Sequence, residues 1–129
     1  MGLEDNIMSK SVVIICEDSP IGKNSAIEAI RMGVGIMVLG DLDECKIVFM
    51  GDAVYLLSKS FNPETVNMEN SENIFHMLEL SEIEVYVLDS ALENAGLKEE
   101  DLKVFDNVHI ATLKEISGYI LKADTTYRF

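Results

Sequence analysis

The sequence predicts a single α/β domain in which helices flank a five-stranded parallel sheet, giving three layers (α/β/α). Apolar segments of strand length alternate with segments of helical periodicity along the chain. This alternation is typical of parallel sheets with right-handed crossovers. The chain has 129 residues, of which 48% are hydrophobic and 26% charged. That length and composition are ordinary for one globular domain.

The first expected strand is a continuous apolar run over residues 12–16. Its β-branched residues are typical of a strand buried on both faces. Residues 24–39 follow with apolar side chains at helical spacing, although Gly33 and Gly35 would each cost a helix interior about 1 kcal/mol. The two glycines indicate close packing against the sheet or a neighbouring subunit, or else an early end to the helix.

The rest of the chain repeats this pattern. Gly96 is placed to end a short helix in a left-handed turn, and Thr112 is placed to cap the last helix. We expect residues 1–10 to form a flexible N-terminal segment and residues 11–129 to form the domain. Further strands are expected over residues 46–50, 83–88, 104–111 and 125–129, and further helices over residues 53–59, 72–80, 90–95 and 113–122.

The composition is strongly acidic, with 23 Asp+Glu residues against 10 Lys+Arg and a formal net charge of −13. Nucleic-acid phosphates bind proteins through Lys and Arg side chains that displace counterions, and the sequence has no basic stripe. We therefore expect no nucleic-acid partner and no anionic membrane partner, and we interpret the acidity as a source of solubility. The longest apolar stretch, residues 34–39, is far shorter than the roughly 20 residues of a membrane span.

Two cysteines and no export signal indicate a reducing, cytoplasmic setting. Cys16 ends the first expected strand and Cys45 precedes the second, so on neighbouring parallel strands they would lie roughly 20 Å apart. Bridged cysteines have Cα atoms within about 7 Å of each other, so we expect neither a disulfide nor a shared metal site. His76 and His109 have no ligand partner at the spacing of a metal site, and no metal or cofactor is expected.

A ligand site is expected beyond the carboxyl ends of the strands. In open α/β sheets ligands bind there, where the strand order reverses. We predict a flavodoxin-like order, in which the reversal lies between the first and third strands. The residues that follow the strands would then line one cleft: Glu17, Asp18, Ser19, Asp52, Leu88, Asp89, Ser90 and Thr112.

Cys16 lies at the same edge and is the candidate catalytic residue. The N-terminus of the following helix would lower the pKa of its thiol, whereas the adjacent carboxylates of Glu17 and Asp18 would raise it. The alternative is a buried, unreactive core cysteine.

Four stretches of the chain carry a family resemblance. The first expected strand leads into Ser-Pro-Ile-Gly at 19–22, and the second into Gly-Asp-Ala-Val-Tyr-Leu-Leu at 51–57. The third leads into Leu-Asp-Ser-Ala-Leu-Glu-Asn-Ala-Gly-Leu at 88–97, and the chain ends Tyr-Arg-Phe at 127–129. In this order and spacing, the chain from about residue 12 onward resembles the DsrE/DsrF-like family of sulfur-relay proteins, most closely its TusC/DsrF branch.

The resemblance implies a small α/β domain that forms trimers or hexamers, with itself or with related subunits, and that meets a sulfur-donor or sulfur-acceptor protein. Some members of that family carry a persulfide on a cysteine at the end of the third strand. Counting back from Gly96, that position is Leu88, and leucine cannot hold a persulfide. This favours a non-catalytic or diverged subunit. The alternative within the family is a sulfur carrier that uses Cys16, at most a sulfurtransferase-type activity.

Two interpretations come from other classes of protein. In a receiver-like domain, Glu17, Asp18, Asp89 and Thr112 would surround Mg²⁺, which prefers carboxylate oxygens. The chain stops before the lysine and final helix that a receiver needs, however. A small-ligand module, for example for a flavin, would suit a crevice at the sheet edge, but carboxylates after the first strand would repel a flavin phosphate.

Overall fold

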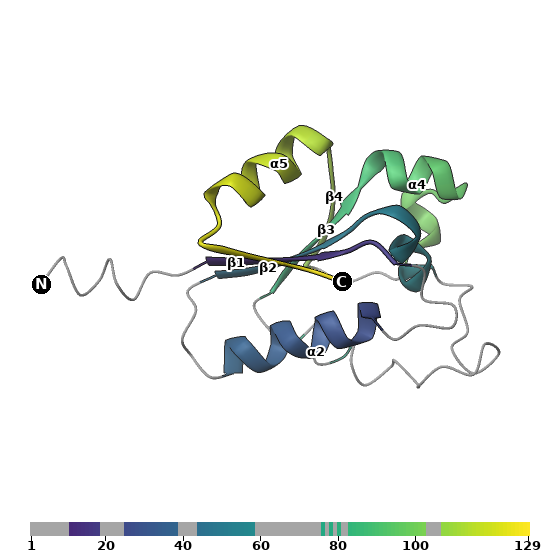
Figure 1. Cartoon of the computed structure of the whole chain (residues 1–129). Helices are drawn as coiled ribbons and strands as arrows, with labels where there is room; N and C mark the ends of the chain where they lie inside the picture. Colours follow the sequence, from purple (N-terminus) through teal and green to yellow (C-terminus); the bar gives the residue numbers. More distant parts are fainter. Residues whose placement is uncertain are drawn as a thin grey trace, which may run out of the picture.

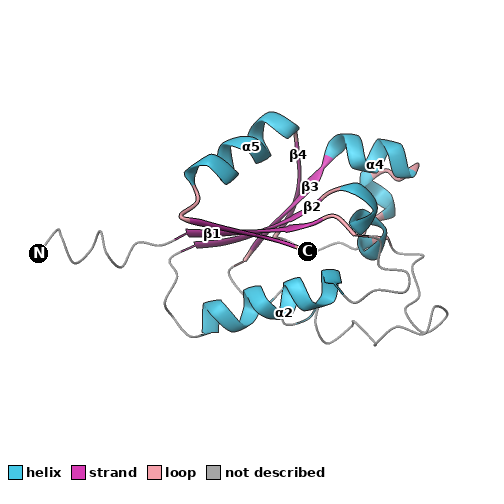
Figure 2. Cartoon of the chain, viewed as in Figure 1, coloured by secondary structure: helices cyan, strands magenta, loops and turns pink. Residues whose placement is uncertain are grey.

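The computed structural model describes residues 11–18, 25–38, 44–58, 76, 78, 80, 83–102 and 107–129. Strands and helices alternate along them as expected (Figures 1 and 2). The elements are β1 (Ser11–Cys16), α2 (Ser25–Val38), β2 (Glu44–Phe49), the 3₁₀ helix η1 (Gly51–Leu57), β3 (Glu84–Leu88), α4 (Asp89–Ala95), the 3₁₀ helix η3 (Glu99–Asp101), β4 (Val108–Ala111), α5 (Leu113–Lys122) and β5 (Thr125–Arg128).

The sheet confirms five parallel strands, but their order differs from the prediction. The order is β4-β3-β2-β1-β5, so β2 lies between β1 and β3, which a flavodoxin-like order would make neighbours. Each strand from β2 to β4 is added beside the one before it, and only β5 returns to the free edge of β1. Right-handed crossovers allow either order, so the alternation of elements did not decide between them. The reversal of strand order therefore lies between β1 and β5.

Helix α2 covers one face of the sheet, and α4 and α5 cover the other (Figure 1). A Cβ atom on Gly33 would lie only 3.2 Å from Ile47 Cδ1 and 3.3 Å from Ile14 Cδ1. The glycine therefore lets α2 approach β1 and β2 closely, as the sequence indicated. No atom lies within 4 Å of the corresponding position on Gly35, so packing does not require a glycine there.

The opposite face carries an aromatic contact between the sheet and α5. The rings of Tyr86 on β3 and Tyr119 on α5 have centroids 4.6 Å apart, and Ile116 of the same helix is buried in the core. The expected cap of α5 is confirmed, because Thr112 Oγ1 accepts a hydrogen bond from the Glu115 amide at 3.2 Å. Gly96 ends α4 with φ 73°, as expected of a left-handed turn.

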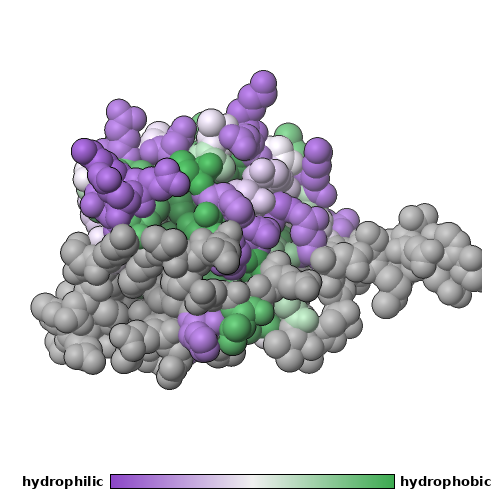
Figure 3. All heavy atoms as spheres, turned by 180° about the vertical axis from the view of Figure 1, so that it is seen from behind, coloured by the Kyte–Doolittle hydropathy of each residue, from purple (hydrophilic) through white to green (hydrophobic). Residues whose placement is uncertain are grey.

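The core is formed mainly by β1, β2, β3 and η1, whose apolar side chains are almost fully buried. Seen from behind, the described surface shows a hydrophobic area among hydrophilic side chains (Figure 3). No helix among the described residues is long and apolar enough to cross a membrane. Exposed large apolar side chains among them are Leu80, Ile110, Leu113, Leu121 and Tyr127.

Several predictions fall outside the described part of the chain. They concern the flexible segment over residues 1–10, Ser19, and most of the helix expected over residues 72–80. They stay predictions.

Candidate functional site

A small pocket lies at the carboxyl edge of the sheet, between η1 and α4. It has a volume of about 180 Å³ and is lined by Gly51, Asp52, Leu88, Ser90, Ala91, Asn94 and Ala95. Three of the predicted cleft residues, Asp52, Leu88 and Ser90, therefore lie together. They meet because β2 and β3 are neighbours, so the turn after β2 lies beside the start of α4.

Gly51 shapes the turn that brings Asp52 to this pocket. Its φ of 55° lies in the left-handed region, and a Cβ atom there would lie 3.0 Å from the backbone oxygen of Glu17. Any other residue would strain the backbone and collide with the end of β1. A glycine directly after a strand was the sequence signal for this turn.

Leu88 closes β3 and is 7% exposed at the pocket. It immediately precedes α4, the junction at which the resemblance places a persulfide-bearing cysteine. Asp89 is exposed next to it, and its Oδ1 accepts a hydrogen bond of 2.7 Å from the Ser90 amide. The Asp89 carboxylate thus accepts from one of the free amides in the first turn of α4, which has no side-chain N-cap.

Cys16 ends β1 at the same edge of the sheet but is only 1% exposed. Burial raises the pKa of its thiol from 9.0 to about 12. Desolvation disfavours the charged thiolate. In the folded chain Cys16 is therefore a buried core cysteine, which was the alternative to a catalytic residue. Cys45 is also a free, buried thiol, and burial raises its pKa to about 11.

The two cysteines are not bridged, as expected. In the register of β1 and β2, Val12 lies opposite Cys45 and Cys16 lies opposite Phe49. The thiols are therefore separated by about four residues along the strands. The rejection of a disulfide is confirmed.

Glu17 contacts the end of the chain and not the pocket. Its carboxylate accepts a hydrogen bond of 2.7 Å from Arg128 Nη2, an ion pair that raises the pKa of the guanidinium. Its backbone amide donates to the Phe129 oxygen at 3.0 Å, and the Phe129 amide donates to the Ile15 oxygen at 2.8 Å. These bonds join the end of the chain to β1 where the strand order reverses. Asp18 follows and is half-buried.

The predicted cleft thus separates into distinct regions. Strand β2 stands between Cys16 and Asp89, because β1 and β3 are not neighbours. Thr112 lies beyond β4 and caps α5 through Glu115. The expectation of a single crevice between β1 and β3 was wrong, since it rested on the flavodoxin-like order.

The same geometry weighs against the two interpretations from other classes. A receiver-like site needs the acids after β1 and β3 side by side, and Glu17 is instead paired with Arg128. No group of three or more potential metal-ligating side chains occurs within the described residues. The pocket, at about 180 Å³, is smaller than the roughly 300–1,000 Å³ of pockets that enclose drug-sized ligands, and a flavin is of that size.

Two residues of this edge were missed from the sequence. Asn94 lines the pocket from α4, four residues after Ser90 and therefore on the same helix face, a spacing that could have revealed it. Arg128 was noted only as part of the chain ending. Its pairing with Glu17 depends on β5 lying beside β1, which strand patterns alone do not specify.

Comparisons with known proteins agree with this architecture. The DsrE/DsrF-like family profile matches residues 10–129. The Protein TusC homolog of Aliivibrio fischeri is 32% identical over 83 residues, which cover 64% of this chain and 69% of that protein. Among solved structures, the ychN protein from E. coli superposes with a TM-score of 0.74 and 25% identity, over 93% of this chain and 99% of the other.

A second solved structure, the protein of unknown function MTH1491 from Methanobacterium thermoautotrophicum, shares the fold. Its TM-score is 0.63 at 15% identity, over 94% of this chain and 99% of that one. The family profile spans nearly the whole domain, and both solved structures share its fold. The chain belongs to the DsrE/DsrF-like family.

Proposed function

We propose that this protein is a non-catalytic subunit of a sulfur-relay assembly. The observation that carries the proposal is Leu88, which occupies the junction of β3 and α4 where the resemblance places the persulfide cysteine. A leucine side chain has no atom that can accept sulfur. The pocket beside it is lined by carbon, hydroxyl, amide and carboxylate groups and by no thiol.

The thiols elsewhere in the chain support the same proposal. The whole sequence contains only Cys16 and Cys45, and both are 1% exposed. Their pKa values, raised to about 12 and about 11 by burial, leave little thiolate at neutral pH. The thiolate is the form that attacks sulfur, so both groups are poor carriers as long as the chain stays folded.

A scaffolding subunit acts through its contacts, and the described surface offers apolar groups for them. Ile110 on β4 and Leu113 and Leu121 on α5 are exposed by 37%, 58% and 85%. We infer association with further copies, as a trimer or hexamer, or with related subunits that bring the missing cysteine. The setting would be the cytoplasm, and the donor or acceptor of sulfur a protein.

The proposal is tested by sulfur loading. The folded chain is incubated with inorganic polysulfide, from which a thiolate takes one sulfur atom, forming a new S–S bond while the polysulfide leaves one atom shorter. Intact-mass spectrometry then measures whether the chain has gained the mass of a sulfur atom. We expect no gain for the wild-type chain and a gain of one sulfur for Leu88→Cys, at residue 88.

The variant Cys16→Ser separates this proposal from its alternative. If the wild-type chain gains a sulfur that Cys16→Ser does not, then Cys16 is the carrier and the non-catalytic assignment is wrong. Sedimentation velocity of the wild-type chain tests self-association independently. A monomer at all concentrations would leave related subunits as the partners.

A further inference from the structure

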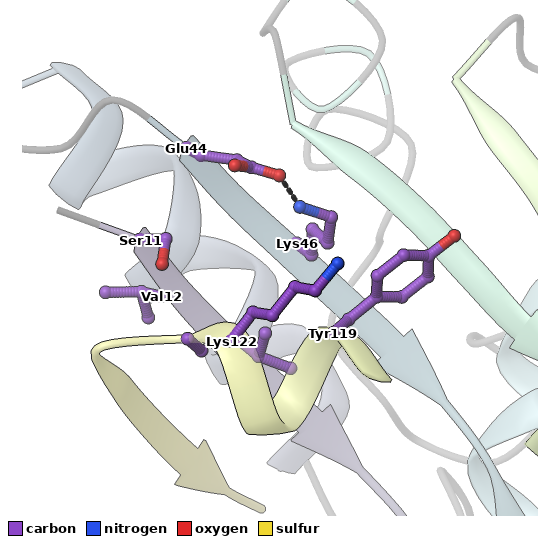
Figure 4. Close-up of a pocket in the computed structure, with 8 residues that line it drawn as sticks. Ser11, Val12, Glu44, Lys46, Tyr119 and Lys122 are labelled. Carbon is purple, nitrogen blue, oxygen red and sulfur yellow. Dashed lines mark ion pairs between the residues drawn. The ribbon is translucent and has the colours of Figure 1, made fainter. Parts of the chain in front are cut away.

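A second pocket lies at the amino end of the sheet, away from the proposed functional edge. Its volume is about 260 Å³, and β1, β2 and the last turn of α5 form its walls. Three segments that are distant in the sequence meet there, and each contributes polar groups (Figure 4). The lining residues are Ser11, Val12, Val13, Glu44, Lys46, Tyr119, Lys122 and Ala123.

Two lysines point into this pocket, Lys46 from β2 and Lys122 from α5 (Figure 4). The whole chain has only 10 Lys+Arg against 23 Asp+Glu. In a chain this acidic, a lysine usually has a carboxylate nearby. Placing two ammonium groups close together costs free energy. The pocket therefore gathers positive charge on a strongly negative protein.

Lys46 is held firmly in this position. Its side chain is only 14% exposed, its Nζ lies 5.3 Å from the centre of the Tyr119 ring, and it forms an ion pair with Glu44. Burial lowers its pKa, the charge of Glu84 raises it, and the charge of Lys122 lowers it. The two ammonium groups are therefore close enough for the charge of Lys122 to act on Lys46.

The carboxylates near the pocket are engaged by groups other than Lys122. The Glu84 carboxylate contacts the His109 imidazole, and its charge raises the pKa of Lys46. Asp124 accepts a hydrogen bond of 2.8 Å from the Ser11 amide. Within the described residues no carboxylate pairs with Lys122, and Glu44 is the one acid among the lining residues.

We propose that this pocket binds a small oxyanion, such as sulfate or phosphate, between the ammonium groups of Lys46 and Lys122. The anion competes with the Glu44 carboxylate for Lys46, and the Glu44 side chain is 53% exposed. The site is distinct from the pocket at Leu88, so it does not depend on the proposed function.

The test is a titration of the ¹⁵N-labelled chain with sodium sulfate and, separately, sodium phosphate, with ionic strength held constant by sodium chloride. We expect saturable amide shifts confined to the pocket, at Ser11, Lys46 and Tyr119. Lys122→Gln should raise the dissociation constant roughly tenfold, the typical effect of losing one charge-assisted hydrogen bond. Lys122 lies on the surface, so this variant should fold normally.

Two further variants make the result specific. Lys114→Gln, on the exposed side of the same helix, removes the same charge outside the pocket and should leave the dissociation constant unchanged. Glu44→Gln removes the competing carboxylate and should tighten binding. The proposal is overturned if the shifts do not saturate, if Lys114→Gln weakens binding as much as Lys122→Gln, or if Glu44→Gln weakens it.

Discussion

The thiol of Cys16 should be nearly inert in the folded chain, and the structure sets the size of this effect. Burial raises its pKa from 9.0 to about 12. Since each pKa unit is a factor of ten, the thiolate fraction near neutral pH falls about a thousandfold. The side chain is also only 1% exposed, which limits access of any reagent. Alkylation of Cys16 should therefore be at least about a thousandfold slower in the folded chain than in the unfolded chain.

The assay is a time course of iodoacetamide labelling, read by peptide mass spectrometry, with the same chain in urea as the reference for an unfolded thiol. Ser90→Cys supplies the folded reference, because residue 90 is exposed at the carboxyl edge of the same sheet. That engineered thiol should react nearly as fast as a thiol in urea. Cys45, with its pKa raised to about 11, should be slowed about a hundredfold by its protonation alone.

One result would refute this reasoning. If Cys16 in the folded chain reacted within about tenfold of the Ser90→Cys thiol, its burial would not protect it. The sulfur-carrier alternative would then regain its chemical basis.

Three further predictions concern stability and are read by chemical denaturation. Thr112→Ala should lower the free energy of unfolding by about 1 kcal/mol, because it removes the side chain that accepts from the Glu115 amide; an unchanged midpoint would contradict the cap. Gly35→Ala should raise the free energy of unfolding by up to about 1 kcal/mol. Gly33→Ala should raise it by less, because the new Cβ atom would lie 3.2 Å from Ile47; a larger increase for Gly33→Ala would contradict the packing of α2. The free energy of unfolding should also fall as pH rises from 9.0 to about 12, since Cys16 keeps its proton in the folded chain while the unfolded thiol ionises. Cys16→Ala should flatten that fall, and an equal slope in both chains would exclude this cause.

The sequence predicted most of the fold because local patterns determine it. The apolar run over residues 12–16 became β1, buried almost throughout. The Thr112 cap and the Gly96 turn bounded α5 and α4 as expected. Each of these features depends on neighbours along the chain, so residue types and their spacing sufficed.

Strand order depends on contacts between distant segments, and local patterns do not carry it. The return of β5 to the edge of β1 places Arg128 against Glu17, a contact that joins residues 111 positions apart. The grouping of the candidate site residues likewise depends on strand order, which local patterns do not determine. Asp52 and Ser90 lie together because β2 and β3 are neighbours in the observed order, a pairing that the flavodoxin-like order did not predict. Cys16 and Asp89 were grouped only through that predicted order, and β2 separates their strands.

The topology also bears on the role that we propose for residue 88 at the carboxyl edge. The side chain of Cys16 belongs to an interior strand, with β2 on one side and β5 on the other, and it is buried in the core that α2 covers. A thiol there is protected by the fold itself. The junction of β3 and α4 opens instead onto the pocket between η1 and α4. If residue 88 is the position that carries sulfur in the family, as we propose, leucine leaves this edge without a nucleophile, and we expect any sulfur passed there to be held by another protein.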